Sequence, residues 1–141
     1  MHIFDNKIII VTGAGQGIGQ GVSRRFARAG GTVIVADINV DAGQQTANYL
    51  QALGGKGYYI PYDLFDVNGV EKLIVQIVDQ FGQVDVLVNN AYPSGLIPPG
   101  PIESKPMDGY HKTMQAGFFA IDKYHGYCFP AYEGKAIWSN Y

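Results

Sequence analysis

KIIIVTGAGQGIG, residues Lys7–Gly19, joins a short apolar run to a cluster of glycines and then to a helical pattern. Glycine lets the backbone turn with a positive φ and lets a ligand approach main-chain N–H groups closely. A helix predicted to begin at about Gly17 directs its unpaired N–H groups and the positive end of its dipole at the same place. The stretch therefore predicts a strand, a turn and a helix whose exposed amides, at Gly13, Gly17 and Gly19, bind a pyrophosphate.

The spacing of the glycines does not follow G-x-G-x-x-G in any register. It follows Gly13-x-x-x-Gly17-x-Gly19, with Thr12 in front. In this form it resembles the T-G-x-x-x-G-I-G motif of the short-chain dehydrogenase/reductase family. The resemblance implies a nicotinamide dinucleotide cofactor and hydride transfer between nicotinamide and a carbonyl or alcohol. The residues that it implies around the diphosphate are Thr12, Gly13, Gln16, Gly17, Ile18 and Gly19.

Composition and charge limit the other classes of function. A chain of 141 residues with 47% hydrophobic composition is long enough for one domain with a core. A formal net charge of −2 and the absence of a Lys/Arg run argue against binding to nucleic acid or an anionic membrane. The single cysteine, Cys128, forms no intrachain disulfide, the start Met1–Lys7 is unlike a signal peptide, and the apolar run Ile8–Val11 is too short to span a bilayer. We therefore expect a cytoplasmic protein.

Apolar runs typical of buried strands alternate with amphipathic helical patterns along the chain. Strands are predicted at Ile8–Val11, Thr32–Asp37, Gly57–Tyr62, Val84–Asn89 and Gly134–Tyr141. Helices are predicted from Gly17 to about Arg28, over Val40–Leu53, from a cap at Asp66 to Gly82, and over Met107–Cys128. This alternation predicts an α/β fold with a Rossmann-type doubly wound parallel sheet of about five strands, the fourth of them buried on both faces. We expect residues 1–141 to form a single dinucleotide-binding domain, incomplete at its C-terminal end.

The second and third predicted helices have apolar faces at helical spacing. Asn39 is expected to cap the second helix, and Gly82 to end the third. The positions predicted to face the core are Ala42, Thr46, Tyr49, Leu50 and Leu53 on the second helix, and Val70, Leu73, Ile74, Ile77, Val78 and Phe81 on the third.

Asp37 ends the second predicted strand, 18 positions after Gly19. Dinucleotide-binding folds place an acid at about this offset, where it contacts the adenosine ribose. Its carboxylate can accept hydrogen bonds from both ribose hydroxyls, whereas a 2′-phosphate would meet like-charge repulsion. Gln16 and Ile38, where NADP-preferring relatives often carry a basic residue, are uncharged. We therefore predict NAD in preference to NADP; the alternative role for Asp37 is a helix cap or a solvated acid at the strand end.

Further cofactor residues follow from the resemblance alone. It implies that the Asp63 carboxylate accepts from the exocyclic amine of adenine and that the Leu64 N–H donates to the ring, although Asp63 is also typical of a turn. Asn89-Asn90-Ala91 resembles the family's N-N-A-G motif, which follows the fourth strand and backs the cofactor's ribose. Tyr92 stands where the family has glycine, and its ring either crowds the nicotinamide side or turns outward.

The family's catalytic residues are not found in these 141 residues. Its members use Tyr-x-x-x-Lys, in which the lysine lowers the phenol pKa from about 10. Each of the seven lysines here has a residue other than tyrosine four positions earlier. The helix asparagine is replaced by Gln115 or Gly117, depending on register, and the strand position of the catalytic serine falls on Tyr141, two places after Ser139. We assign no catalytic residue, and the spacing of His111, His125 and Cys128 predicts no metal site.

Three functions remain open. The first alternative is the NAD-binding portion of an oxidoreductase whose catalytic residues lie elsewhere. The second is a complete module that binds NAD without turnover, and the third is an interaction protein. For the last, the partner surface would be the helix after Met107 or the exposed strand at Gly134–Tyr141, either of which would also make a homo-oligomer.

Overall fold

Four parallel strands form one sheet in a computed structural model that describes residues 2–66, 68–93, 96–97 and 99–116. The strands are β1 (Ile8–Thr12), β2 (Thr32–Asp37), β3 (Lys56–Pro61) and β4 (Val86–Val88), in the order β3-β2-β1-β4. The helices are α1 (Gly17–Arg28), α2 (Val40–Ala52), α3 (Gly69–Phe81) and α4 (Met107–Met114), with a short 3₁₀ turn at Ile102–Ser104. The predicted α/β doubly wound parallel sheet is confirmed, with four strands in the described part of the chain.

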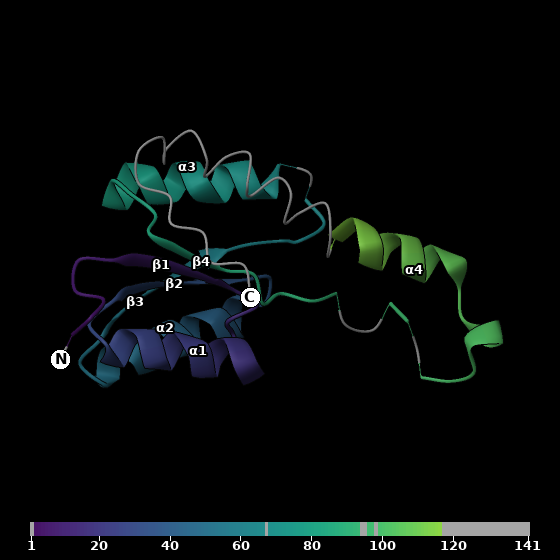
Figure 1. The fold of residues 1–141 in the computed structure, drawn as a ribbon, viewed down its shortest axis with the longest axis horizontal. Helices are drawn as coiled ribbons and strands as arrows, with labels where there is room; N and C mark the ends of the chain where they lie inside the picture. The colour runs from purple at the N-terminus through teal and green to yellow at the C-terminus, as the bar shows by residue number, and fades with distance from the viewer. Residues whose placement is uncertain (1, 67, 94–95, 98, 117–141) are drawn as a thin grey trace.

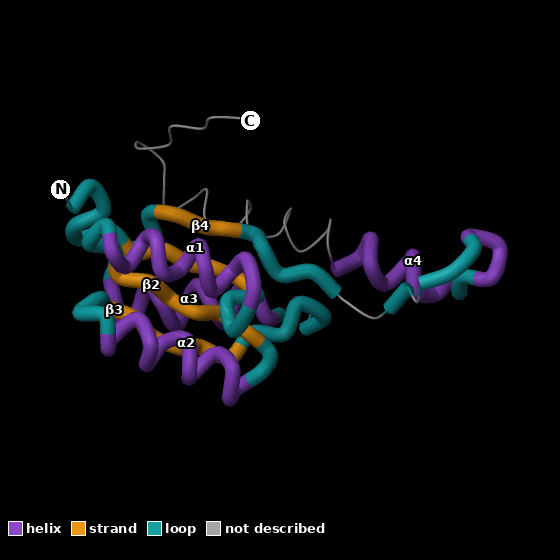
Figure 2. Tube along the Cα trace, turned by 90° about the horizontal axis from the view of Figure 1, so that it is seen from below, coloured by secondary structure: helices purple, strands orange, loops and turns teal. Residues whose placement is uncertain are grey.

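The sheet lies between two layers of helices. Alternate residues of β1 face opposite sides: Ile8 and Ile10 belong to the core cluster under α3, whereas Ile9 and Val11 belong to the cluster under α1 and α2. Figure 1 shows α3 on one face of the sheet and α1 with α2 on the other. Figure 2 looks from the side of α1 and α2 and shows the four strands side by side, with α4 apart from the layers.

Strand β1 has a neighbouring strand on each side in the sheet. β2 pairs with β1 on one side, with Thr12 opposite Ala36, and β4 pairs with it on the other, with Val11 opposite Val88. Helices α1 and α2 cover one face and α3 the other, so the strand order switches between β1 and β4. In open α/β sheets, a switch of this kind opens a crevice at the carboxyl ends of the strands.

The ends of α2 and α3 can be compared with the predicted helix caps. Asn39 caps α2, because its side chain accepts a hydrogen bond from the N–H of Ala42 at 3.0 Å, and Gly82 ends α3 with φ 80°. The predicted cap at Asp66 is wrong by two residues, since Asn68 is the N-cap of α3. The Asp66 carboxylate instead accepts from the N–H of Asn68 at 2.9 Å, which makes a turn before the helix.

The buried face of α2 differs from the prediction by about one residue. Tyr49 and Leu53 are 40% and 43% exposed, while Gly43 and Ala47 are buried. Small residues turn toward the sheet because the helix lies very close to β3: a Cβ added at Gly57 would be 2.8 Å from the carbonyl oxygen of Ala47. On α3, Val78 is also exposed, at 38%.

The prediction that the fourth strand is buried on both faces is wrong for the described residues. All three residues of β4 are half-buried. Within the described sheet β4 is an edge strand with β1 as its one neighbour, so its side chains lack the second flanking strand. The predicted strand at Gly134–Tyr141 and the second half of the predicted helix to Cys128 lie outside the described residues.

Asp85 joins the start of β4 to the start of β1. Its carboxylate accepts from the N–H of Ile8 at 2.8 Å, from Nζ of Lys7 at 2.8 Å and from the side-chain amide of Gln83 at 2.7 Å. Burial raises the pKa of Asp85, but these three donors outweigh it, and the pKa lies below its ordinary value. The ionised carboxylate therefore stabilises the register of the two strands.

We predict that Asp85→Ala lowers the free energy of unfolding at pH 7 by about 1–3 kcal/mol, because the N–H of Ile8 loses a charged acceptor. A carboxyl with a lowered pKa contributes stability above its ordinary pKa and loses it as the pH falls through the lowered value. The difference between wild type and variant should therefore shrink below about pH 4. Urea unfolding at pH 7 and pH 3 measures it. Asp79→Ala, at an exposed position of α3, is the control, and an equal effect of both substitutions would contradict the prediction.

Candidate functional site

The glycine-rich loop lies between β1 and α1, at the carboxyl edge of the sheet. Gly13 and Gly17 have φ values of 63° and 58°, which favour glycine. The N–H of Gly13 donates to the carbonyl of Ala36 at 2.7 Å, so this amide is held by β2. The expectation that Gly13 offers its amide to the diphosphate is therefore wrong in this structure.

The other side of the loop is held by the chain that leaves β4. Oγ1 of Thr12 donates to the carbonyl of Val88 at 3.2 Å and accepts from the N–H groups of Asn90 and Ala91, each at 3.0 Å. The side-chain amide of Asn90 donates to the carbonyls of Thr12 and Gly13, at 2.9 and 3.1 Å. Thr12 and Asn90 thus lock the loop to the end of β4, across the point where the strand order switches.

The absence of side chains at Gly13 and Gly19 makes this contact close. A Cβ at Gly13 would be 2.8 Å from Cα of Ala91, and a Cβ at Gly19 would be 2.6 Å from the side-chain nitrogen of Asn90 and would also meet the carbonyl of Gly13. Real side chains do not fit at these separations. Glycine at these two positions therefore allows the close approach of Asn90 and Ala91, which fixes the conformation of the loop.

The first turn of α1 leaves main-chain donors open. Among the described residues, no acceptor pairs with the N–H groups of Gly17, Ile18 or Gly19, and the N-cap Gln16 makes no side-chain hydrogen bond to the turn. A Cβ added at Gly17 would meet nothing within 4 Å, and Ile18 is 79% exposed. The start of the turn, at Gly17 and Ile18, is therefore open to solvent.

The charge of this turn also differs from that of the other described helices. The first turns of α2, α3 and α4 each hold an acid, at Asp41, Glu71 and Asp108, whereas the first turn of α1 holds none. An acid at this place would offset the positive end of the helix dipole. Since nothing in the first turn of α1 does so, it can receive an anion from outside the chain.

The Asp37 carboxylate lies beside the loop, at the end of β2. One oxygen accepts from the N–H of Gly15 at 2.7 Å and the other from the N–H of Asn39 at 2.9 Å. The residue is 9% exposed. A carboxylate oxygen has two acceptor directions, so each oxygen of Asp37 keeps capacity for a further donor. Gly15 is required here, because a Cβ would be 2.9 Å from this carboxylate.

Thr46 of α2 supports the loop from the third side, and the sequence interpretation missed this role. Its hydroxyl donates to the carbonyl of Gly15 at 3.0 Å and accepts from the side-chain amide of Gln20 at 3.0 Å. Thr46 was predicted only as a core position. The signal in the sequence was a hydroxyl residue at a predicted core position, because a buried hydroxyl needs a hydrogen-bond partner.

The remaining predicted site residues are less tightly joined to the loop. Asp63 and Leu64 follow β3 and are half-buried, and the Asp63 carboxylate accepts from the N–H of Phe65 at 2.8 Å, as in a turn. Asn89 is exposed, and no hydrogen bond joins it to the loop among the described residues. Tyr92 is 67% exposed, so of its two alternatives the ring turns outward.

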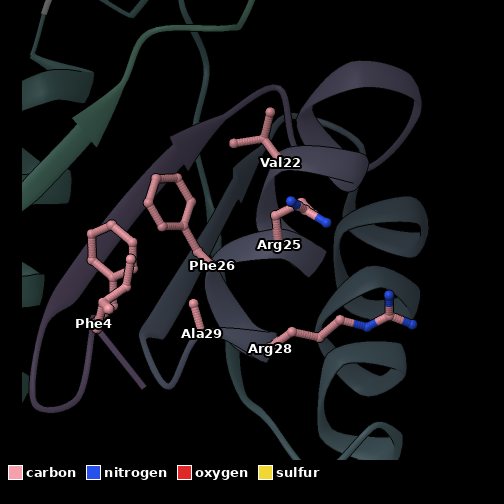
Figure 3. A pocket seen from close by; sticks show the side chains of 7 residues that line it. Phe4, Val22, Arg25, Phe26, Arg28 and Ala29 are labelled. Carbon is pink, nitrogen blue, oxygen red and sulfur yellow. The ribbon is translucent and has the colours of Figure 1, made fainter. Parts of the chain in front are cut away.

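A cavity of about 420 Å³ lies at the opposite end of α1. It is lined by Ile3, Phe4, Val22, Arg25, Phe26, Arg28 and Ala29. Figure 3 shows the rings of Phe4 and Phe26 near one another, with Arg28 extending away from them. The ring centroids are 4.9 Å apart, in an edge-to-face arrangement. Because Arg28 ends the helix that Gly17 begins, this cavity is separate from the glycine loop.

The described part of the chain contains neither a cluster of metal ligands nor a membrane-spanning helix. No group of three or more His, Cys, Asp or Glu side chains is arranged to hold a metal ion there. None of the described helices has both the length and the hydropathy that crossing a bilayer requires.

Comparisons with known proteins give matches over most of the chain. A family model described as short chain dehydrogenase matches residues 7–135. An uncharacterized oxidoreductase of Thermotoga maritima is 35% identical over 124 residues, which make up 86% of this chain and 47% of that protein. The chain thus spans about half the length of this curated relative.

Solved structures share the arrangement of strands and helices. A hydroxysteroid dehydrogenase from Escherichia coli superposes with a TM-score of 0.80 at 33% identity, over 90% of this chain and 52% of that one. A metagenomic short-chain oxidoreductase in complex with NADP superposes with a TM-score of 0.83 over 92% of this chain and 57% of that one, and its 22% identity supports the fold alone. With the matched family model and the loop between β1 and α1 in place, the chain belongs to the short-chain dehydrogenase family.

Proposed function

We propose that this chain is the NAD(H)-binding portion of an oxidoreductase that transfers hydride between nicotinamide and a carbonyl or alcohol. The observation that carries the proposal is the first turn of α1, where three main-chain N–H groups have no acceptor among the described residues and the turn itself holds no acid. Main-chain N–H groups at a helix N-terminus bind phosphate groups well. Membership of a dehydrogenase family supports a dinucleotide as the source of those phosphates.

The dinucleotide would lie along the carboxyl edge of the sheet. In the proposal, Gln16, Gly17, Ile18 and Gly19 surround the diphosphate, and Thr12 and Gly13 shape the loop under it. Asp37 accepts from the adenosine ribose, and Asp63 and Leu64 contact adenine. Asn89, Asn90 and Ala91 back the second ribose. The hydride chemistry belongs to the bound nicotinamide, while this chain binds and orients it.

NAD is the proposed cofactor in preference to NADP. The Asp37 carboxylate is 9% exposed and is held by two main-chain donors, so it keeps its position when a ligand approaches. Ribose hydroxyls can donate to its remaining acceptor sites, whereas a 2′-phosphate would bring a second negative charge into a poorly solvated place. Gln16 and Ile38 supply no positive charge to offset it.

The proposal for this chain concerns binding of the cofactor and assigns neither a substrate nor a proton-transfer residue. No Tyr-x-x-x-Lys occurs in the 141 residues, so the alternative is a module that holds NAD(H) without turnover. We place the chain in the cytoplasm as a single dinucleotide-binding domain. Loss of NADH signal on adding ketones to the chain with NADH, or gain of NADH signal on adding alcohols to the chain with NAD, would distinguish turnover from binding alone.

A second candidate function is association through α4. Met107 and Met114, one heptad apart on this helix, are 69% and 59% exposed, and α4 stands apart from the sheet layers in both views of the fold. Exposed methionines on a separate helix favour contact with a second copy of the chain. Sedimentation equilibrium of the wild type and of Met107→Glu tests this role.

We predict that Ile18→Glu weakens NADH binding about tenfold or more, because it places a negative charge beside the open amides, and tenfold corresponds to about 1.4 kcal/mol. The same charge should leave the fold intact or raise its stability slightly, since an acid in the first turn offsets the helix dipole. NADH fluorescence titration and urea unfolding measure the two effects.

The matched control is Ile102→Glu, because Ile102 is also strongly exposed, at 72%, and belongs to the 3₁₀ turn rather than to the glycine loop. It should bind NADH as the wild type does. Unchanged NADH affinity in Ile18→Glu would remove the first turn of α1 from the site, and a wild-type chain that binds no NADH would overturn the proposed function.

We predict that Asp37→Ala weakens NADH binding by about tenfold or more, because hydrogen bonds to a charged group contribute about 1.5–3 kcal/mol. NADPH should lose less, so the ratio of the two dissociation constants should move toward one. Parallel titrations with NADH and NADPH measure the ratio. Asp41→Ala, an exposed acid of α2 close in sequence, is the control. Equal losses for both nucleotides would show that Asp37 holds the loop without selecting the sugar.

A further inference from the structure

Tyr59 of β3 reaches the main chain of the residue that ends β2. Its hydroxyl donates to the carbonyl of Asp37 at 3.1 Å. The N–H of Tyr62 donates to the same oxygen, also at 3.1 Å. Strand β3 therefore holds Asp37 through both a side chain and the backbone, on the side away from the glycine loop.

Gly43, in the first part of α2, makes room for the ring of Tyr59. A Cβ added at Gly43 would overlap Cδ2 and Cε2 of that ring. Glycine in a helix interior is destabilising relative to alanine. Here the position is buried, and the space that a side chain would fill is taken by Tyr59. The tyrosine and the glycine thus form a matched pair.

The phenol is a donor at neutral pH. Burial raises the pKa of Tyr59, and the negative charge of Asp37 raises it further. Both causes favour the protonated hydroxyl, which is the form that donates to a carbonyl.

We propose that Tyr59 and Gly43 are a positioning pair that holds the Asp37 carboxylate in place and thereby sets the preference for NADH over NADPH. The inference rests on the proposed function, since it concerns which dinucleotide that site accepts. Neither residue touches the cofactor in this proposal, and both act through Asp37.

The reason lies in the turn between β2 and α2. The N–H of Asn39 donates to the Asp37 carboxylate at 2.9 Å, and the Asn39 side chain caps α2. A movement of the carboxylate therefore also moves the backbone of this turn, from Asp37 to the start of α2. A 2′-phosphate would require the carboxylate to withdraw, because two negative charges close together in a poorly solvated site repel strongly. Withdrawal pulls the Asp37 carbonyl away from the Tyr59 hydroxyl. The hydroxyl therefore opposes the movement that NADPH needs.

The test compares Tyr59→Phe with Tyr58→Phe. The first keeps the ring against Gly43 and removes only the hydroxyl. Tyr58 is the preceding residue of the same strand but faces the other side, where it is 44% exposed and contacts the ring of Phe81. A neutral hydrogen bond contributes about 0.5–1.5 kcal/mol, so the ratio of NADPH to NADH dissociation constants should fall about twofold to tenfold in Tyr59→Phe. In Tyr58→Phe it should stay at the wild-type value.

Gly43→Ala provides a second route to the same change. The added methyl group displaces the ring, so the ratio of NADPH to NADH dissociation constants should fall again. In the Tyr59→Phe background, Gly43→Ala should lower this ratio little further, because the hydrogen bond is already absent. Urea unfolding of each variant measures any loss of stability. A purely structural role would weaken the binding of NADH and NADPH equally and leave the ratio of their dissociation constants unchanged.

Each outcome decides a different claim. A wild type that prefers NADH, with the same ratio in Tyr59→Phe, overturns the positioning role and leaves the proposed function standing. A wild type that binds neither nucleotide overturns the proposed function and the inference with it. A lowered ratio in Tyr59→Phe and Gly43→Ala, with Tyr58→Phe unchanged, supports the pair.

Discussion

The contact between the glycine loop and the chain leaving β4 is the constraint on which the rest of the structure depends. Thr12 and Asn90 exchange hydrogen bonds across the two strand ends, and the backbone at Ala91 lies where a side chain at Gly13 would be. This contact joins the two halves of the sheet at the point where their order switches. Any side chain at Gly13 or Gly19 would separate them.

The main-chain N–H groups of the loop fall into two sets, those bound within the protein and those left without an acceptor among the described residues. Strand β2 takes the N–H of Gly13 through Ala36, and the Asp37 carboxylate takes that of Gly15. The donors left for a ligand are those of the first turn of α1, which is also the described helix whose first turn has neither an acid nor a side-chain cap. The loop is hydrogen-bonded to β2, to α2 and to the chain after β4, while the first turn of α1 keeps donors that are unpaired in the described part of the chain, which is a favourable arrangement for binding an anion without reorganisation.

Family membership and the donors of α1 that lack an acceptor among the described residues both support the proposed dinucleotide. The chain spans about half the length of the Thermotoga maritima relative, and its described part contains the parallel sheet with the glycine loop. The cavity beside Phe4 and Phe26 lies at the far end of α1 and shares no residue with the loop. The proposed cofactor site therefore lies within the described part of the fold, and function has to be argued from that site rather than from the fold alone.

Local patterns in the sequence determined the strands and helices, the Asn39 cap, the end at Gly82 and the place of the glycine loop, because hydrophobic periodicity and glycine act over a few residues. Tertiary structure alone decided how the pieces meet. It assigned the Gly13 amide to Ala36, turned Gly43 and Ala47 rather than Tyr49 toward the sheet, and brought Thr46 under Gly15. These outcomes depend on distances between segments far apart in the chain, which no local pattern records.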